Sequence, residues 1–218
     1  MRRVGTTVNG GAGELSTWLE RHVMPGPDMA GAFRVNFASV PLGSVPADFS
    51  FVCTGGHNEG TWTIVSETTA LEGKALEHAS TEATNGYWPL AIHMPCAIAN
   101  FDIEARFKII TGTMKRAGLV LRLIDRNNYY AVVASALEER IDFYRVINGS
   151  MQRLWSTEAR VILNSWHVLG VSVEADHFTI SLDNRSIATI WDRMSVVRQI
   201  ETDGGMNYRS DRPIRLLV

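Results

Sequence analysis

The stretch DRNNYYAVVASALEERIDFYRVINGS, residues 125–150, carries two β-hairpin signals. Two adjacent tyrosines, Tyr129 and Tyr130, open its first apolar run, and the pair Asn148-Gly149 closes its second. Asn-Gly between alternating runs is the strongest short-range signal of a hairpin. Successive side chains of a strand point to opposite faces of its sheet. We therefore expect Tyr130 in a core between two sheets and Tyr129 on the opposite face.

The same period of two extends outward from this stretch. In FDIEARFKI, residues 101–109, apolar and charged side chains alternate, which is typical of an antiparallel strand with one face in water. HFTISLD (177–183) and VLGVSVE (168–174) repeat the pattern, and turn signals separate the runs. Many short strands with regular turns predict an all-β, antiparallel sandwich. The predicted core is Phe101, Ile103, Phe107, Leu119, Leu121, Tyr130, Trp166, Val171, Phe178 and Ile180.

The first 31 residues follow a different pattern. Apolar residues recur there at helical spacing, and Pro25-Gly26-Pro27 ends the run. The sequence thus predicts a short N-terminal helical arm and linker over 1–31 and a sandwich domain over 32–218. A helix this short is marginal alone, so it either docks, with a homodimer as one outcome, or is a disordered leader. The stripe is Leu15, Trp18, Leu19, His22 and Val23.

Composition excludes several classes of protein. The chain has 218 residues, 45% of them hydrophobic and 20% charged, which fits one large globular domain. A net charge of −2 without charge blocks gives no case for nucleic acid, and no apolar run approaches the roughly 18 residues of a membrane span. The initial MRR is not followed by an apolar segment, so the chain as written predicts a cytoplasmic location. Cys53 and Cys96 are either two thiols or a disulfide.

Familiar catalytic motifs are missing from the sequence. It has no GxSxG, no HExxH and no P-loop, and its histidines have no metal-ligand spacing, so we expect no cofactor and no metal. Asp102 and Glu104 share one strand face, as a glycosidase pair would, but we favour a solvated face. Asp125, Asn127 and Asn128 offer oxygens to calcium, yet these residues are also typical of turns, which we favour.

Three stretches resemble a known family. They are TEATNGYWPLAIH (81–93), the long run from FDIEARFKII to RVINGS (101–150) and SWHVLGVSVEADHFTISLDN (165–184). Together they resemble bacterial domains of the concanavalin A-like lectin/glucanase type, similar to laminin-G-like domains and to the 3-keto-disaccharide hydrolase family. The resemblance runs from about Phe33 to Asp192; the tail after Asp192 departs from the pattern, as a divergent strand or a shifted reading frame. Relatives are usually secreted or periplasmic.

This resemblance implies a jelly-roll sandwich whose concave sheet binds glycans. Sugar rings stack on aromatic side chains, and their hydroxyls need planar polar partners. The candidate ligand-binding residues are Arg122, Tyr129 and Tyr144 on the concave sheet, with Asn85, Trp88 and His93 on its rim. Many relatives carry Arg and Asn where this chain has Val133 and Ser135.

Three functions stay open from the sequence. The first is a non-catalytic, lectin-like carbohydrate-binding module. The second is a glycoside-processing enzyme of the 3-keto-disaccharide hydrolase or glucanase type. The third is a protein-interaction or assembly domain. The missing carboxylate motif favours the first over the second, and the sequence names no particular glycan.

Overall fold

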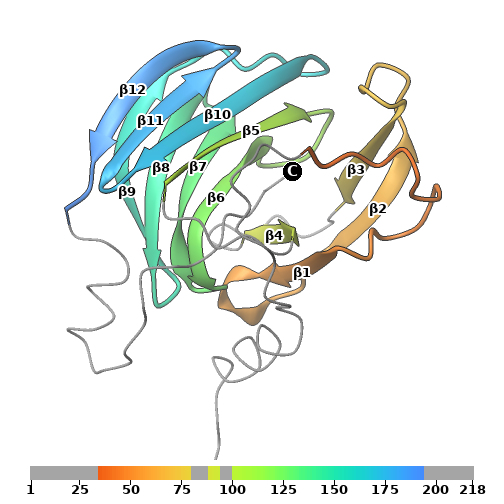
Figure 1. Ribbon diagram of the computed structural model, residues 1–218, viewed down its shortest axis with the longest axis horizontal. Helices are drawn as coiled ribbons and strands as arrows, with labels where there is room; N and C mark the ends of the chain where they lie inside the picture. Colours follow the sequence, from red (N-terminus) through yellow and green to blue (C-terminus); the bar gives the residue numbers. More distant parts are fainter. Residues whose placement is uncertain (1–33, 80–87, 94–99, 194–218) are drawn as a thin grey trace, which may run out of the picture.

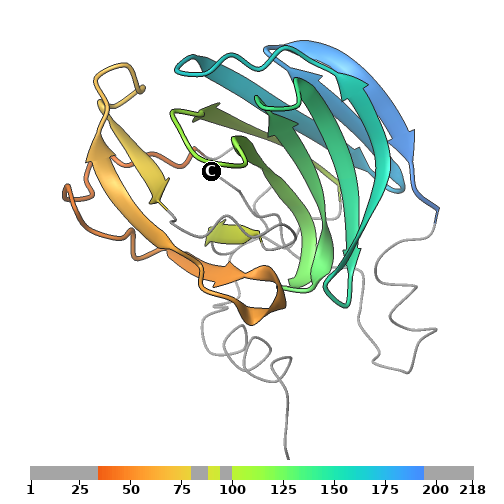
Figure 2. The same cartoon turned by 180° about the vertical axis from the view of Figure 1, so that it is seen from behind.

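The computed structural model describes residues 34–79, 88–93 and 100–193. Within these ranges nearly all regular structure is β-strand, which confirms the all-β prediction (Figures 1 and 2). No helix in the described ranges is long and apolar enough to cross a membrane. The helical arm and dimer contact predicted for 1–31, and the tail after 193, lie outside the described residues.

The strands are β1 (Phe49–Cys53), β2 (Thr61–Ser66), β3 (Lys74–Ala79), β4 (Pro89–His93), β5 (Phe101–Lys108), β6 (Arg116–Asp125), β7 (Asn128–Ser135), β8 (Arg140–Ile147), β9 (Ser150–Glu158), β10 (Trp166–Glu174), β11 (His177–Leu182) and β12 (Arg185–Trp191), with a 3₁₀ turn, η1 (Thr54–Gly56).

The strands form two larger sheets and a smaller layer. The outer sheet has the order β12-β11-β10-β5, and the central sheet has the order β6-β7-β8-β9. The pairs β1-β4 and β2-β3 make the N-terminal layer, which gathers on the side away from β12 in both views (Figures 1 and 2). Every recorded pairing is antiparallel, as the alternating sequence and short turns predict.

The main core lies between the outer and central sheets. Tyr130, Phe143 and Phe178 meet at its centre, with ring centroids 4.9–5.6 Å apart. Most predicted core residues are buried here, and Phe101 and Ile103 pack against the cluster half-buried. The prediction that Trp166 lies in the core is wrong. The alternation that turns His167 and Leu169 inward sends Trp166 to the opposite face, where Arg106 and Lys108 lie over its ring.

The central sheet is also covered on part of its second face. β7 is buried along its whole length, which requires packing on both sides. Leu90 and Ile92 of β4 pack there against Val120, Tyr129 and neighbouring apolar side chains. Ala91, between them in sequence, points the other way into a third cluster with Trp62 and Ile64. β4 is therefore a middle layer, with one face on the central sheet and the other on β2 and β3.

A bulge in β6 changes which way its side chains point. Arg122 adopts φ 47°, and the register with β7 shifts between Leu121 and Asp125. A bulge places one extra residue in a strand, so alternation inverts beyond it. Leu119 and Leu121 enter the main core as expected. Leu123, which unbroken alternation would place on the same face, lies in the cluster on the other face of the sheet.

One ion pair joins the N-terminal layer to the outer sheet. Lys108, at the end of β5, binds Glu67, which follows β2, and Trp166 Nε1 donates to Thr69 Oγ1 at 2.8 Å. The hydrogen bond from Lys108 lowers the pKa of Glu67 from 4.5 to about 2. This contact holds the turn after β2 against the edge of the outer sheet.

Candidate functional site

The two tyrosines that open β7 do point to opposite faces. Tyr130 enters the main core, and Tyr129 lies in the second cluster. Tyr129 is fully buried, however, and its hydroxyl lies 2.5 Å from Thr54 Oγ1 of η1. Burial raises the pKa of Tyr129, so the phenol stays neutral. The expectation of an open ring is corrected: β4 and η1 cover the position where a sugar would stack.

Arg122 lies away from Tyr129, which corrects a second expectation. Because of the bulge, its guanidinium turns toward the outer sheet, donates to the carbonyl of Ala175 and lies 5.1 Å from the centroid of the Phe178 ring. Burial lowers the pKa of this guanidinium. Arg122 thus holds the turn between β10 and β11.

Two of the predicted site residues do meet. Trp88, just before β4, and Tyr144 of β8 pack edge to face with ring centroids 5.0 Å apart, and both are half-buried. Trp88 also lies 6.5 Å from the ring of Tyr129. His93 is on the other face of β4, where it packs on Phe49 and binds Asp48 at 3.0 Å. Asn85 lies outside the described residues.

A carboxylate that sequence analysis did not select stands beside this aromatic pair. Asp142 is 1% exposed, and its Oδ2 accepts hydrogen bonds from Arg140 Nε at 2.9 Å and from the Tyr144 hydroxyl at 3.1 Å. Its Oδ1 is buried and meets no hydrogen-bond donor among the described residues. The guanidinium nitrogen Arg153 Nη1 lies 3.7 Å from this oxygen. A buried polar atom without a donor is costly, so this oxygen is unusual.

The strand register explains why Oδ1 lacks a donor on the β7 side. Asp142 pairs with Val133 of β7, which in turn pairs with Gly118 of β6. Neither side chain can donate a hydrogen bond. A Cβ at Gly118 would lie 2.3 Å from the Val132 carbonyl oxygen, so only glycine fits this row. On the β7 side the carboxylate therefore faces side chains without hydrogen-bonding groups, and on its other side it pairs with the exposed Ser156 of β9.

Charged side chains extend the site toward the end of the sheet. Glu138 binds Arg116 at 2.8 Å and Arg140 at 3.0 Å, and Arg140 also binds Asp142. Burial favours the neutral form of Glu138, but its bonds to the two arginines prevail and lower its pKa. Arg153 has a half-exposed side chain (48%). We call Asp142, Tyr144, Trp88, Arg140 and Arg153 the Asp142 site.

The structure also shows where the other candidate residues from the sequence lie. Asp102 and Glu104 are exposed on the outer sheet, as expected of a solvated strand face. The Asp125 carboxylate accepts hydrogen bonds from the Asn127 amide and the Asn128 side chain, which are contacts of a turn. Cys53 is buried, and Cys96 lies outside the described residues.

Solved structures of similar fold are known. The carbohydrate-binding module CBM66 from Bacillus subtilis is 21% identical, with a TM-score of 0.51 over 70% of this chain and 84% of that one. Domain 4 of the arabinanase AbnA from Geobacillus stearothermophilus, in complex with arabinotriose, has a TM-score of 0.45 at 14% identity, over 78% of each chain. Sheep galectin-11, in complex with glycerol, has a TM-score of 0.43 at 7% identity, over 59% of this chain and 93% of that one. No protein-family model and no curated protein matches the chain. The likeness to the module shows the fold, an antiparallel β-sandwich.

Proposed function

We propose that this protein is a non-catalytic carbohydrate-binding module and that it binds sugar at the Asp142 site. One observation carries the proposal: a buried carboxylate oxygen, Asp142 Oδ1, meets no donor among the described residues. Because this oxygen is buried, a ligand reaches it only when a neighbouring side chain, such as the half-exposed Arg153, moves aside. A sugar hydroxyl is a neutral donor that would then satisfy the oxygen with a charge-assisted hydrogen bond, which is stronger than a neutral one.

The residues around Asp142 suit the rest of a sugar ring. Trp88 and Tyr144 offer half-buried aromatic surface for its C–H face, and the half-exposed Arg153 offers donors for hydroxyl and ring oxygens. Arg140 and the Tyr144 hydroxyl fix the orientation of the carboxylate before any ligand arrives. Such preorganisation lowers the entropic cost of binding. Tyr129 acts behind the site as a packing partner of Trp88, and Asn85 stays a prediction.

The charges argue for binding over hydrolysis. A glycosidase acid needs a raised pKa so that it holds a proton near neutral pH. The second carboxylate here, Glu138, has a lowered pKa because Arg116 and Arg140 bind it. The fold of a carbohydrate-binding module agrees with this proposal, although fold alone assigns no ligand.

The test is a panel of gluco-, xylo-, galacto-, fructo- and arabino-oligosaccharides titrated into the full chain by calorimetry. We expect at least one to bind and Asp142→Asn to remove most of its affinity. Glu104→Gln, which changes an exposed carboxylate on the outer sheet, is the matched control and should bind as the parent does. Turnover of chromogenic or 3-keto glycosides that Asp142→Asn abolishes would replace the proposal with an enzyme. A panel that shows neither binding nor turnover would favour an assembly domain.

A further inference from the structure

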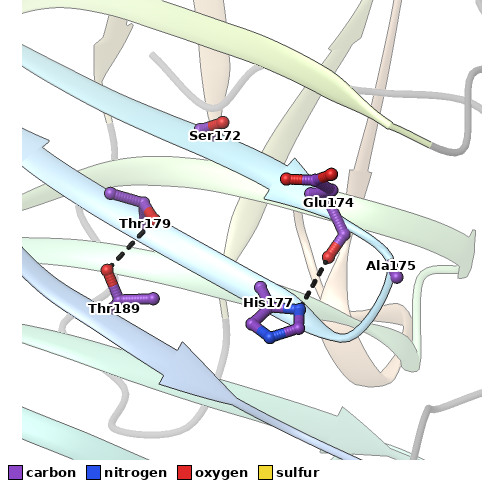
Figure 3. A pocket seen from close by; sticks show the side chains of 6 residues that line it. All are labelled: Ser172, Glu174, Ala175, His177, Thr179 and Thr189. Atoms are coloured by element: carbon purple, nitrogen blue, oxygen red, sulfur yellow. Dashed lines mark hydrogen bonds between the residues drawn. The ribbon is translucent and has the colours of Figure 1, made fainter.

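The outward face of the outer sheet contains a pocket that the proposed function does not use. It lies over β10, β11 and β12, on the side of the sheet that faces away from the main core (Figure 3). Hydroxyl, carboxylate and imidazole groups line it, and the Thr179 and Thr189 hydroxyls bond each other across its floor at 3.1 Å. Its lining residues are Ser172, Glu174, Ala175, His177, Thr179 and Thr189.

The turn that forms one rim of this pocket is held in place from three directions. Ala175 adopts φ 51°, a left-handed conformation that is strained for alanine. Its amide donates to Asn100 Oδ1 at 2.8 Å, and its carbonyl accepts from Arg122. The carbonyl of Asp176 accepts from the amide of Asp192 at 3.0 Å. The rim is therefore fixed before any ligand binds, as preorganised sites require.

An exposed tryptophan stands next to the pocket. Trp191, at the end of β12, is 60% exposed, and its ring meets the imidazole of His177 edge to face at 5.5 Å between centroids. The register pairs Trp191 with His177 and Thr189 with Thr179. Since side chains two apart on a strand share a face, the indole lies on the same surface as the pocket. A large exposed indole next to hydroxyl groups is a surface suited to a sugar ring.

The charges around the pocket favour neutral sugars over anionic ones. Glu174 lines it, Asp176 follows in the same turn, and Asp102 lies opposite Ser172 on β5. None of the six described lining residues is lysine or arginine. His177 lies 3.0 Å from the Asp176 carboxylate, which engages its Nδ1. An anionic sugar would meet like charge here, whereas a neutral sugar would find acceptors for its hydroxyls.

We propose that this surface is a second binding site, specific for neutral sugars and separate from the Asp142 site. The ring stacks on Trp191, and its hydroxyls bond to Glu174 and to the Thr179 and Thr189 hydroxyls. The two sites differ in charge, because arginines surround Asp142, whereas the charged side chain that lines this pocket is the carboxylate of Glu174 and the guanidinium of Arg122 is bound to the Ala175 carbonyl at its rim. Two sites on one domain permit the chain to bridge glycan strands, with avidity that can exceed single-site affinity by about 10²–10⁴.

The test is nuclear magnetic resonance of the full chain labelled uniformly with the heavy nitrogen isotope. The indole N–H signal of Trp191 is identified by its loss in Trp191→Phe. The probes are neutral gluco-, xylo- and arabino-oligosaccharides at millimolar concentration and an anionic oligogalacturonide. We expect a neutral probe to shift the Trp191 signal in the parent and in Asp142→Asn alike, and the oligogalacturonide to leave it unchanged. Thr189→Val, which keeps shape and removes the hydroxyl, should weaken this binding at least threefold. Trp191→Ala, which lacks the indole signal, is followed by the backbone amide signals of the pocket and should abolish their shifts.

Each result tests the second site independently of the Asp142 site. Trp166→Ala, the same change on the same sheet, is the matched control and should keep the Trp191 response. A Trp191 signal that no neutral probe moves would overturn the second site, even if calorimetry shows binding at Asp142. A shift lost in Asp142→Asn would also overturn it, because the response would then belong to the Asp142 site. A response that persists when Asp142→Asn has lost its own binding supports it.

Discussion

Replacing Asp142 by asparagine separates a binding role from a structural one. The side chain keeps its shape but loses its charge, so its bond from Tyr144 becomes neutral, while its bond from Arg140 keeps only the charge of the guanidinium. Hydrogen bonds to charged groups contribute about 1.5–3 kcal/mol and neutral ones about 0.5–1.5 kcal/mol. Oδ1 has no donor to lose among the described residues. We therefore expect the free energy of unfolding to fall by only about 1–2 kcal/mol.

The effect on sugar binding should be larger. The asparagine amide presents either a neutral oxygen or an NH₂ group where the carboxylate oxygen stood, and the NH₂ group cannot accept from a sugar hydroxyl. A lost charge-assisted hydrogen bond of about 2 kcal/mol corresponds to an affinity loss of about 30-fold, at 1.4 kcal/mol per tenfold.

Denaturant unfolding and calorimetric titration with the same preparation measure the two quantities. Glu104→Gln should change neither, because its carboxylate is exposed on the outer sheet. A folded Asp142→Asn variant that binds as tightly as the parent would refute the assignment of Asp142 to the site. The assignment would also be refuted if the loss of affinity matched the loss of stability and disappeared at low temperature, where the parent and Asp142→Asn are both fully folded.

Three further predictions concern the layers that hold the site. Tyr129→Phe should lower the free energy of unfolding by about 1 kcal/mol, and Thr54→Val should lower it by more, because Thr54 Oγ1 also donates to the Trp88 carbonyl at 3.3 Å. The double variant should lose little more than Thr54→Val alone, because both changes remove the bond between the two hydroxyls; full additivity in denaturant unfolding would contradict this. The pKa of Glu67 is lowered from 4.5 to about 2 in the fold, so its contribution is present above pH 4.5 and is lost as pH falls toward 2. Lys108→Met should flatten the decline of stability in that window, and an unchanged pH profile would rule out the ion pair as its cause. Phe178→Ala should cost about 3–5 kcal/mol, since its fully buried ring packs on Tyr130 and Phe143; a thermal unfolding midpoint near that of the parent would show that the core lies elsewhere.

Alternation predicted the sandwich because it is a local property of each strand. The apolar and charged positions of residues 101–109 are set by which face meets the other sheet, and that face is the same in the structure. Alternation also placed Tyr129 and Tyr130 on opposite faces. It failed at Arg122, where a bulge shifts the register, because no residue of the stretch AGLVLRLI marks the position of an extra residue.

The candidate site was harder to predict for a different reason. Asp142 sits between Ile141 and Phe143 and reads as an ordinary outward-facing residue of an alternating strand. Its burial depends on residues far away in the sequence. The aromatic group that lies against its neighbour Tyr144 comes from Trp88, and nothing in residues 140–147 indicates that a segment more than fifty positions earlier lies there. Long-range packing of this kind leaves no local periodicity to detect.

The N-terminal layer therefore does more than close the domain. Leu90 and Ile92 cover the apolar part of the central sheet's second face. Trp88, the residue before β4, packs at the edge of this apolar cluster, next to the polar side chains of the Asp142 site. Asp142 lies just beyond Tyr144 along β8, on the same face. The carboxylate belongs to the central sheet, and the indole packs on the neighbouring Tyr144 only when β4 is docked. A sugar that uses both must bind the docked state more tightly, and by linkage it should stabilise the packing of β4 on the central sheet.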